Sequence, residues 1–462
     1  MYTVATLCLV YLTAITIQAI HRVFLHSLRK FPGPWVAAAT HYYRAYYDIV
    51  KGGAWTEHMV ELHERYGPVV RVSPSELHFS DPKAFDDIHV VPKPLKDHHF
   101  YRALATQDAI VTIIDPKEAS KRRVRVGSYF SRRAVLQLEQ TIQKNINKLI
   151  ARLTSEPYSG DRPADLLYAY RATTMDIIMS YLFAQEFGAL DYPGFAHPLL
   201  VSLDGIIGGT WIMYYLQPLG DLMKILPESV IRKLNPMAAP LLDQVHHIDQ
   251  KVEELTLKAV KDTADSKAIF HVWMDKANGS DPWNVPKSQI MDECTSMQLA
   301  GSDTVGNACM IGTFHILRKR MTLTKLRREL DALCEEQMTF EALAKLPYLA
   351  TIKESLRLSH GVASPLPRVV GPSGSAIAGV TVPPGAVVSS AAYIVHTNPI
   401  IFPDPQEFVP ERWLDNRELD KYLVAFSKGP RICLGVNLAW AELYLIFANV
   451  FRRLEFELHD AP

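Results

Sequence analysis

One loop near the C-terminus, Phe426-Ser427-Lys428-Gly429-Pro430-Arg431-Ile432-Cys433-Leu434-Gly435, constrains the fold of this chain more than any other feature. Its two glycines permit a tight backbone around the cysteine, Arg431 brings positive charge and Phe426 gives cover. The apolar helix predicted to follow directs its N-terminal dipole at the sulfur. A thiolate that ligates a metal needs backbone amides, positive potential and shelter from water. The alternative is an inert buried thiol in a glycine-rich turn.

The spacing F-x-x-G-x-R-x-C-x-G in this loop resembles the haem-binding signature of the cytochrome P450 family. The resemblance implies that Cys433 is the axial thiolate ligand of the iron of haem b. Phe426, Gly429, Arg431 and Gly435 are then the cofactor-binding residues of the surrounding loop. The resemblance also implies the cytochrome P450 fold, which is mainly α with a small β region, and an activity that uses O2 as a co-substrate.

Two further segments resemble this family and are expected to be structural. Glu354-Ser355-Leu356-Arg357 fits the family's E-x-x-R motif, and the i, i+3 spacing puts both charges on one helix face. Pro410-Glu411-Arg412-Trp413 is similar to the family's P-E-R-F segment. By resemblance, Glu354, Arg357 and Arg412 form a buried triad that holds the core beside the haem.

The apolar helical stretch that contains Ala300-Gly301-Ser302-Asp303-Thr304-Val305 resembles the family's oxygen-activation motif. A glycine inside a helix costs about 1 kcal/mol relative to alanine, and a threonine hydroxyl that bonds to a preceding carbonyl bends the helix. Together they predict a groove for O2 and water, where Asp303 and Thr304 relay protons. Without the cysteine loop, a solvated acid beside a threonine would be the default interpretation. Val305 replaces the usual hydroxyl residue, which leaves the relay one polar group short.

Haem carries two propionates, and planar guanidinium groups suit carboxylates. The resemblance makes Arg431, Arg368 and Arg123 the candidates for these contacts. Related enzymes usually have histidine or tryptophan four residues before the arginine at position 123, but this chain has Ala119 there. One propionate contact is therefore expected to be missing.

Residues 1–20 are almost entirely apolar, and as a helix of about 30 Å they are long enough to cross a bilayer. Arg22, Arg29 and Lys30 follow, which favours an uncleaved single-pass anchor with a cytosolic catalytic domain over a cleaved signal. Phe31-Pro32-Gly33-Pro34-Trp35 cannot continue a helix. The predicted organisation is a transmembrane anchor at 1–25, a Pro/Gly hinge and linker at 26–50, and one catalytic domain at 51–462.

Composition excludes some classes of protein. Lysine plus arginine and aspartate plus glutamate each total 49, so no net field attracts nucleic acid. Five scattered cysteines argue against a disulfide framework and suit a reducing compartment. Asn278 begins a glycosylation sequon that a cytosolic domain would leave unused. His98, His99 and His396 follow no metal-binding spacing and are interpreted as structural.

Short strands are predicted at 68–72 and around 379–385, and helices dominate from 115 to 355. After the last predicted helix, residues 454–458 alternate apolar and acidic side chains as a strand would, and the sequence stops at Pro462. Members of the family usually continue into a short sheet at this point. We therefore expect a shortened C-terminal sheet, with 454–462 either poorly ordered or paired with an internal strand.

The similarity covers nearly the whole chain and most resembles fungal microsomal enzymes of secondary metabolism, of the trichodiene oxygenase type, through residues 66–71 and 345–354. It implies insertion of one atom of O2 into a lipophilic terpenoid or polyketide. No flavin or nicotinamide domain is recognisable, so we expect NADPH electrons to arrive through a separate cytochrome P450 reductase in the endoplasmic reticulum membrane. The basic run 121–125, Arg132 and Arg133 fit either docking of that partner or a solvated helix face. The apolar substrate pocket is expected to be lined by Ile110, Val111, Ala300, Val362, Ala363 and Leu366.

Two other functions stay open from the sequence. One is a haem-thiolate isomerase, dehydratase or ring-forming enzyme, against which Asp303 and Thr304 argue because such reactions need no oxygen-activating relay. The other is a non-catalytic membrane protein with a vestigial haem site, against which the intact Cys433, Glu354 and Arg357 argue.

Overall fold

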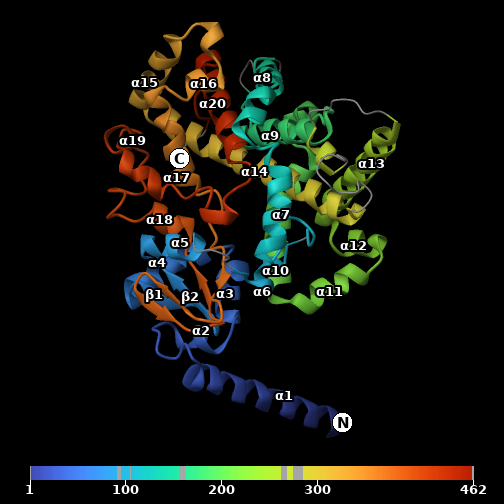
Figure 1. The fold of residues 1–462 in the computed structure, drawn as a ribbon, viewed down its shortest axis with the longest axis vertical. Coiled ribbons are helices and arrows are strands. Elements are labelled where there is room, and N and C mark those ends of the chain that lie inside the picture. The colour runs from blue at the N-terminus through green and yellow to red at the C-terminus, as the bar shows by residue number, and fades with distance from the viewer. Residues whose placement is uncertain are drawn as a thin grey trace.

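The computed structural model describes residues 2–90, 95–104, 106–155, 158, 162–261, 268–273 and 285–459. Helices form most of the body, and the strands gather toward the end from which the N-terminal helix projects (Figure 1). The prediction of a mainly α fold with a small β region is therefore confirmed. Asn278 and its sequon lie outside the described residues.

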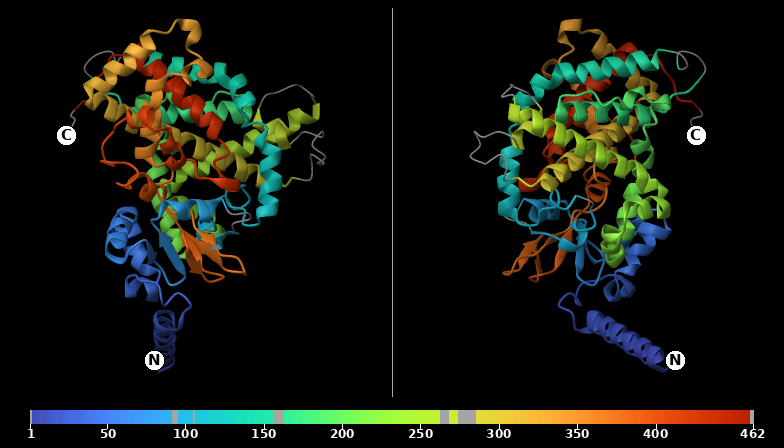
Figure 2. Two further views of the ribbon diagram at one scale, coloured as in Figure 1. Left: turned by 60° about the vertical axis from the view of Figure 1, so that its left-hand side comes forward. Right: turned by 90° about the vertical axis from the view of Figure 1, so that its right-hand side faces the viewer.

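Helix α1, Tyr2–Ile20, continues into a π-helical turn at His21–Leu25 and points away from the body (Figures 1 and 2). The stretch Thr6–Leu25 is long and apolar enough to cross a membrane and is not buried in the protein. A second stretch, Pro193–Tyr215, passes the same test of length and composition, but part of it is buried. α1 is therefore a candidate membrane span that stands apart from the folded body.

The segment 26–50, predicted as a hinge and linker, is folded onto the body. Leu28 is fully buried with side chains of the sheet, and Pro32 O accepts a hydrogen bond from Arg71 N at 2.7 Å. The N-terminal helical stretch ends at Leu25, before the Pro-Gly-Pro sequence, and apolar residues on either side of that sequence pack against the body. The segment contains α2 at Trp35–Ala39, α3 at Tyr42–Ala45 and a π-helical turn at Tyr46–Val50.

The main sheet has the strand order β1-β2-β7-β4-β3, in which β2 and β7 are parallel and the other neighbours are antiparallel. A separate hairpin, β5–β6, turns at Ala378 and Gly379, both of which have positive φ, as a tight hairpin turn requires. The prediction of a strand at 68–72 is confirmed, and β6 lies in the region around 379–385 where the sequence predicts a short strand. The strands are β1 Val69–Arg71, β2 Glu76–Phe79, β3 Leu95–Lys96, β4 Arg368–Val369, β5 Ser375–Ile377, β6 Val380–Val382 and β7 Val387–Ser389.

Three helices form the centre of the core: α9 at Leu166–Phe183, α14 at Lys287–Arg318 and α20 at Val436–Arg453. α9 is buried on almost every face, as expected of a helix that is apolar all round. α14 has 32 residues and is therefore about 48 Å long, enough to cross the whole domain. Gly301 allows α14 to approach α9, because a Cβ at this position would lie 2.9 Å from the Ile178 side chain.

The other helices surround this centre and complete the body. They are α4 Trp55–Tyr66, α5 Pro82–His89, α6 His98–Tyr101, α7 Pro116–Gly127, α8 Arg132–Leu153, α10 Pro198–Tyr215, α11 Gln217–Ile225, α12 Glu228–Leu234, α13 Ala239–Lys261, α15 Arg320–Asp331, α16 Phe340–Leu343, α17 Thr351–Ser359, α18 Ala392–His396 and α19 Arg412–Asp415.

The C-terminal segment does not form the strand predicted at 454–458. Leu454 O accepts a hydrogen bond from Arg327 Nη2 at 2.9 Å, and Phe456 stacks on Phe451 with ring centroids 5.9 Å apart. The Arg327 hydrogen bond and the contact between the two phenylalanine rings thus hold this segment, where the prediction expected the backbone hydrogen bonds of a β-sheet. Up to residue 459 the segment does not pair with an internal strand. Residues 460–462 lie outside the described part of the chain.

Candidate active site

A cavity of about 560 Å³ lies between α14, α20, the helix α10 and the cysteine loop. The residues that line it come from segments far apart in the sequence, and most of its lining is apolar. Asp303, Gly429 and Ala363 are not part of the lining. The predicted residues that do line it are Ile110, Val111, Arg123, Ala300, Thr304, Val362, Leu366, Arg368, Phe426, Arg431, Cys433 and Gly435.

The cysteine loop is held in a conformation that only its own sequence permits. Gly429 has a φ of +69°, and a Cβ there would lie 2.2 Å from His89 O, so a larger residue would clash with the main chain. Cys433 N donates a hydrogen bond to Phe426 O at 2.9 Å, which closes the loop. The Cys433 side chain opens into the cavity.

Cys433 is exposed to the cavity that it lines, and protein atoms pack around its thiol. Burial raises the pKa of the Cys433 thiol, while a hydrogen bond from the Gly435 backbone and the positive charge of Arg123 oppose that rise. The backbone amide and the nearby cation are two of the features expected around a thiolate ligand. Arg123 is thus close enough to act on the sulfur electrostatically.

Hydroxyl groups reach the carbonyls of α14 beside the cavity. Thr304 Oγ1 donates to Ala300 O at 3.0 Å, which is the local bond predicted from the motif. Thr174 Oγ1, on α9, donates to Ser302 O at 2.6 Å. Thr304 therefore presents a hydroxyl to the cavity from a part of α14 whose carbonyls already have side-chain partners.

Asp303 lies outside the cavity lining and is held by an arginine that no motif indicated. Arg171 Nη2, on α9, lies 2.6 Å from Asp303 Oδ1 and 3.5 Å from Asp204 Oδ1. The Arg171 side chain is 7% exposed, whereas that of Asp204 is 72% exposed. The ion pair thus connects the acid next to Thr304 with the protein surface.

The three predicted propionate arginines meet at the cavity and bind no carboxylate among the described residues. Burial lowers the pKa of Arg431 to about 10, and the positive charges of Arg368 and Arg123 add to that shift. Arg368 Nε is buried without a hydrogen-bond partner. Such a set of cations beside a thiol fits a group that carries carboxylates and an iron ion that a thiolate can ligate. Their hydrogen bonds run from Arg123 Nη2 to Ile432 O at 2.7 Å, from Arg368 Nη1 to Tyr101 Oη at 2.9 Å and from Arg431 Nη2 to Ile113 O at 3.0 Å.

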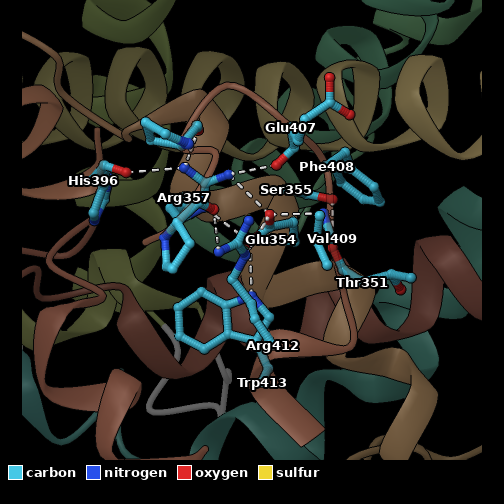
Figure 3. A network of polar contacts seen from close by, with 12 residues as sticks. Thr351, Glu354, Ser355, Arg357, His396, Glu407, Phe408, Val409, Arg412 and Trp413 are labelled. Atoms are coloured by element: carbon cyan, nitrogen blue, oxygen red, sulfur yellow. Dashed lines mark hydrogen bonds and ion pairs between the residues drawn. The ribbon is translucent and has the colours of Figure 1, made fainter. Parts of the chain in front are cut away.

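Glu354, Arg357 and Arg412, called the triad below, come together as the sequence predicts (Figure 3). Glu354 Oε1 accepts from Arg357 Nη2 at 2.8 Å and from Arg412 Nε at 3.2 Å, and its Oε2 accepts from Trp413 Nε1 at 2.8 Å. Arg357 is fully buried and also donates to the carbonyl of His396 at 2.9 Å. The triad lies outside the cavity lining, which is consistent with a structural role.

Sequence reasoning missed several residues that line the cavity. Ile207, Trp211 and Tyr214 belong to α10. The sequence of α10 is apolar and carries no motif, so it does not reveal whether the helix lines a cavity, lies in the core or spans a membrane. Glu293 is a buried acid on α14; burial raises its pKa to about 7, although a hydrogen bond from the backbone of Ile110 opposes the rise. A single glutamate outside any motif does not show from the sequence alone that it will be buried beside a cavity.

Comparison with known proteins agrees with this geometry. A model of the cytochrome P450 family matches residues 42–462. Cytochrome P450 monooxygenase BOT1 of Botryotinia fuckeliana is 32% identical, over 99% of this chain and 91% of the relative. Cytochrome P450 monooxygenase aflU of Aspergillus parasiticus is 34% identical, over 98% and 92%. Cytochrome P450 monooxygenase TRI4 of Fusarium sporotrichioides is 31% identical, over 95% and 86%. The chain belongs to the cytochrome P450 family.

Proposed function

We propose that this protein is a haem-thiolate monooxygenase that inserts one atom of O2 into a lipophilic small molecule, with Cys433 as the residue that would hold the haem iron. The observation that carries the proposal is the meeting of Cys433, Thr304 and the three arginines at one largely apolar cavity. Cys433 would hold the haem iron, and a haem bound there would supply the activation of O2.

The residues of the chain have separate tasks in this proposal. Arg123, Arg368 and Arg431 bind the haem carboxylates, since their guanidinium groups have no carboxylate partner among the described residues. The Thr304 hydroxyl carries a proton at Oγ1 beside the cavity. It donates this proton in a hydrogen bond to Ala300 O and can donate it to a bound group in the cavity when one is present. Proton supply near the reacting atoms is a positioned acid–base function.

Asp303 supplies protons to Thr304 in this proposal, and Arg171 controls its orientation. The Arg171 guanidinium holds Asp303 away from the cavity lining, so the carboxylate must exchange this partner before it can turn toward the neighbouring hydroxyl. Asp204, which shares Arg171 and is largely exposed, offers the competing anion for that exchange.

The substrate is assigned as a lipophilic terpenoid or polyketide of fungal secondary metabolism. The apolar walls around α10 and α14 remove carbon surface from water, which favours such a molecule. The relatives are fungal monooxygenases, but one of them, a tryptophan 6-hydroxylase of Fusarium equiseti with 33% identity, is named for a different class of substrate. Similarity to these proteins therefore supports the reaction more strongly than the substrate.

Residues 1–25 are proposed as a single-pass anchor in the endoplasmic reticulum membrane, with the catalytic domain in the cytosol. The unburied apolar stretch Thr6–Leu25 and the basic residues after it support this topology. NADPH electrons are proposed to arrive through a separate cytochrome P450 reductase. Arg132 and Arg133, exposed at the start of α8, are candidates for contact with that partner.

The reaction can be tested with purified protein, a fungal cytochrome P450 reductase, NADPH and a panel of terpenoids and polyketides under ¹⁸O2. The proposal predicts a product that carries one ¹⁸O atom and whose formation requires NADPH. A rearranged or dehydrated product without ¹⁸O would instead support the isomerase or dehydratase alternative.

A further inference from the structure

Lys96 is a buried lysine on which the positive charges of Arg431, Arg368 and Arg123 act. It is 5% exposed and lines the cavity. The register of β3 and β4 places Lys96 directly opposite Arg368. Like charges at opposite positions of an antiparallel pair destabilise it, so this arrangement needs a compensating charge.

The Lys96 ammonium group reaches the same part of the cavity as the predicted arginines. Its Nζ donates to Val111 O and lies 4.2 Å from the centre of the Tyr101 ring, whose hydroxyl accepts from Arg368. Arg431 donates to the carbonyl of Ile113, two residues beyond Val111. Tyr101 therefore contacts both Lys96 and Arg368, and the main chain of 111–113 accepts hydrogen bonds from both Lys96 and Arg431.

No carboxylate of the described chain compensates this charge. Lys96 forms no ion pair within the described ranges, and the carboxylate of the adjacent Asp97 is occupied with the backbone N–H groups of His99 and Phe100 at the start of α6. Burial, followed by the charges of the three arginines, lowers the pKa of Lys96 well below its usual value. Binding an anion among these cations would reverse that effect.

We propose that Lys96 is a fourth cationic contact for the haem carboxylates and takes the role that the family gives to the aromatic donor missing at Ala119. Ala119 is fully buried and offers no polar atom, although it precedes Arg123 by one helical turn on α7. The donor comes from β3 instead, through a sheet position that faces Arg368. Lys96, Arg123, Arg368 and Arg431 are called the cationic cluster below. The inference rests on the proposed haem site.

Haem loss from the holoenzyme to an excess of apomyoglobin tests the role of Lys96. Removal of a hydrogen bond to a charged group predicts release about 10- to 100-fold faster in Lys96→Met than in the wild type. Lys96→Arg keeps the charge and should stay near the wild-type rate. Lys121→Met, at an exposed position of α7, is the matched control and should leave the rate unchanged.

A second variant separates the ionic role from a purely structural one. Lys96→Gln retains a donor for Val111 O without the charge, so the proposal predicts that it also releases haem faster. Release at the wild-type rate from Lys96→Gln would overturn the proposal, whether or not Lys96→Met folds. The carbon-monoxide spectrum of each variant should still be of the thiolate type; a wild-type protein without that spectrum would refute the proposed function and not this contact.

Discussion

The triad is largely buried and the cationic cluster lines the cavity with Lys96 and Arg368 buried and Arg123 and Arg431 partly buried, and the two sets of charged side chains are compensated in different ways. In the triad, the Glu354 carboxylate accepts hydrogen bonds from Arg357, Arg412 and Trp413, and Arg357 spends its other donors on main-chain carbonyls. In the cationic cluster, positive groups face one another, and no carboxylate of the described chain neutralises them. The first arrangement is complete without a ligand, whereas the second is not.

This difference separates residues that hold the fold from residues that hold a ligand. Burial of an unbalanced charge is costly, so a chain that retains several such charges beside a cavity is arranged for an external anion. In the triad, one carboxylate serves two guanidinium groups and main-chain carbonyls accept their remaining hydrogen bonds, so no donor of this network is directed at a ligand. Sequence motifs alone do not make this distinction, because both sets consist mostly of arginines.

Glu354→Ala is the change with the largest expected effect on folding. It leaves Arg357 and Arg412 buried without their carboxylate, and breaking a buried pair in this way costs about 3–5 kcal/mol. The yield of folded protein and its free energy of unfolding in urea measure the loss. Glu455→Gln, on a side chain that is 95% exposed, is the control and should change stability by less than about 0.5 kcal/mol. A stability of Glu354→Ala similar to that of the control would remove the triad from the account of the fold.

A pair of arginine variants separates the two clusters directly. Arg412→Leu should lower the free energy of unfolding by about 2 kcal/mol and leave the rate of haem loss unchanged, because Arg412 serves Glu354. Arg368→Leu should show the reverse pattern, with faster haem loss and little loss of folding stability. Urea unfolding and haem transfer to apomyoglobin measure the two quantities on the same preparations. Equal effects of the two variants on both quantities would mean that the clusters are not functionally distinct.

Truncation at the N-terminus tests Arg22, a cation whose hydrogen-bond partners lie within the chain. Arg22 Nη1 donates to Ala39 O at 3.1 Å, and Arg22 O accepts from Arg71 Nη2 at 2.9 Å. Deletion of 1–25 should therefore cost about 1–3 kcal/mol more in stability than deletion of 1–20, which keeps these contacts. Both deletions should release the protein from membranes, as fractionation would show. Equal stability of the two truncated proteins would mean that the turn after α1 does not support the body.

Thr304→Ala should have the smallest effect on folding stability, and its main effect should be on the yield of product. It removes one hydrogen bond to Ala300 O, so unfolding should change by less than about 1 kcal/mol. Product formed per NADPH consumed should fall severalfold, with the missing electrons recovered as peroxide. Thr304→Ser restores the hydroxyl and is the matched control. An unchanged product yield in Thr304→Ala would place the proton supply elsewhere.

The sequence predicts those features of the protein that depend on local motifs. The loop from Phe426 to Gly435, the pairing within Glu354–Arg357 and the threonine bond at Thr304 all follow from fixed spacings and short-range geometry. Strand β1 and the turn at Gly379 are local in the same sense, because valines favour the strand and a glycine permits the turn.

The parts that the sequence does not predict depend on segments far apart in the chain. Arg171 meets Asp303 only because α9 packs against α14, and Lys96 meets Arg368 only through the register of two very short strands. The segment 454–459 has the alternation of a strand, but the contacts of Arg327 and Phe451 decide its conformation. Neither a partner across the fold nor a competing tertiary contact can be read from local periodicity.

The central claim is that Cys433 binds the haem iron as a thiolate, and the absorption spectrum of the reduced, carbon-monoxide-bound protein tests it most directly. The account predicts the red-shifted Soret band of a thiolate-ligated haem in the wild type and in Cys334→Ala, whose thiol is exposed elsewhere on the protein. Cys433→Ala should lose this band. An unshifted band in the wild type, or a red-shifted band that persists in Cys433→Ala, would contradict the claim.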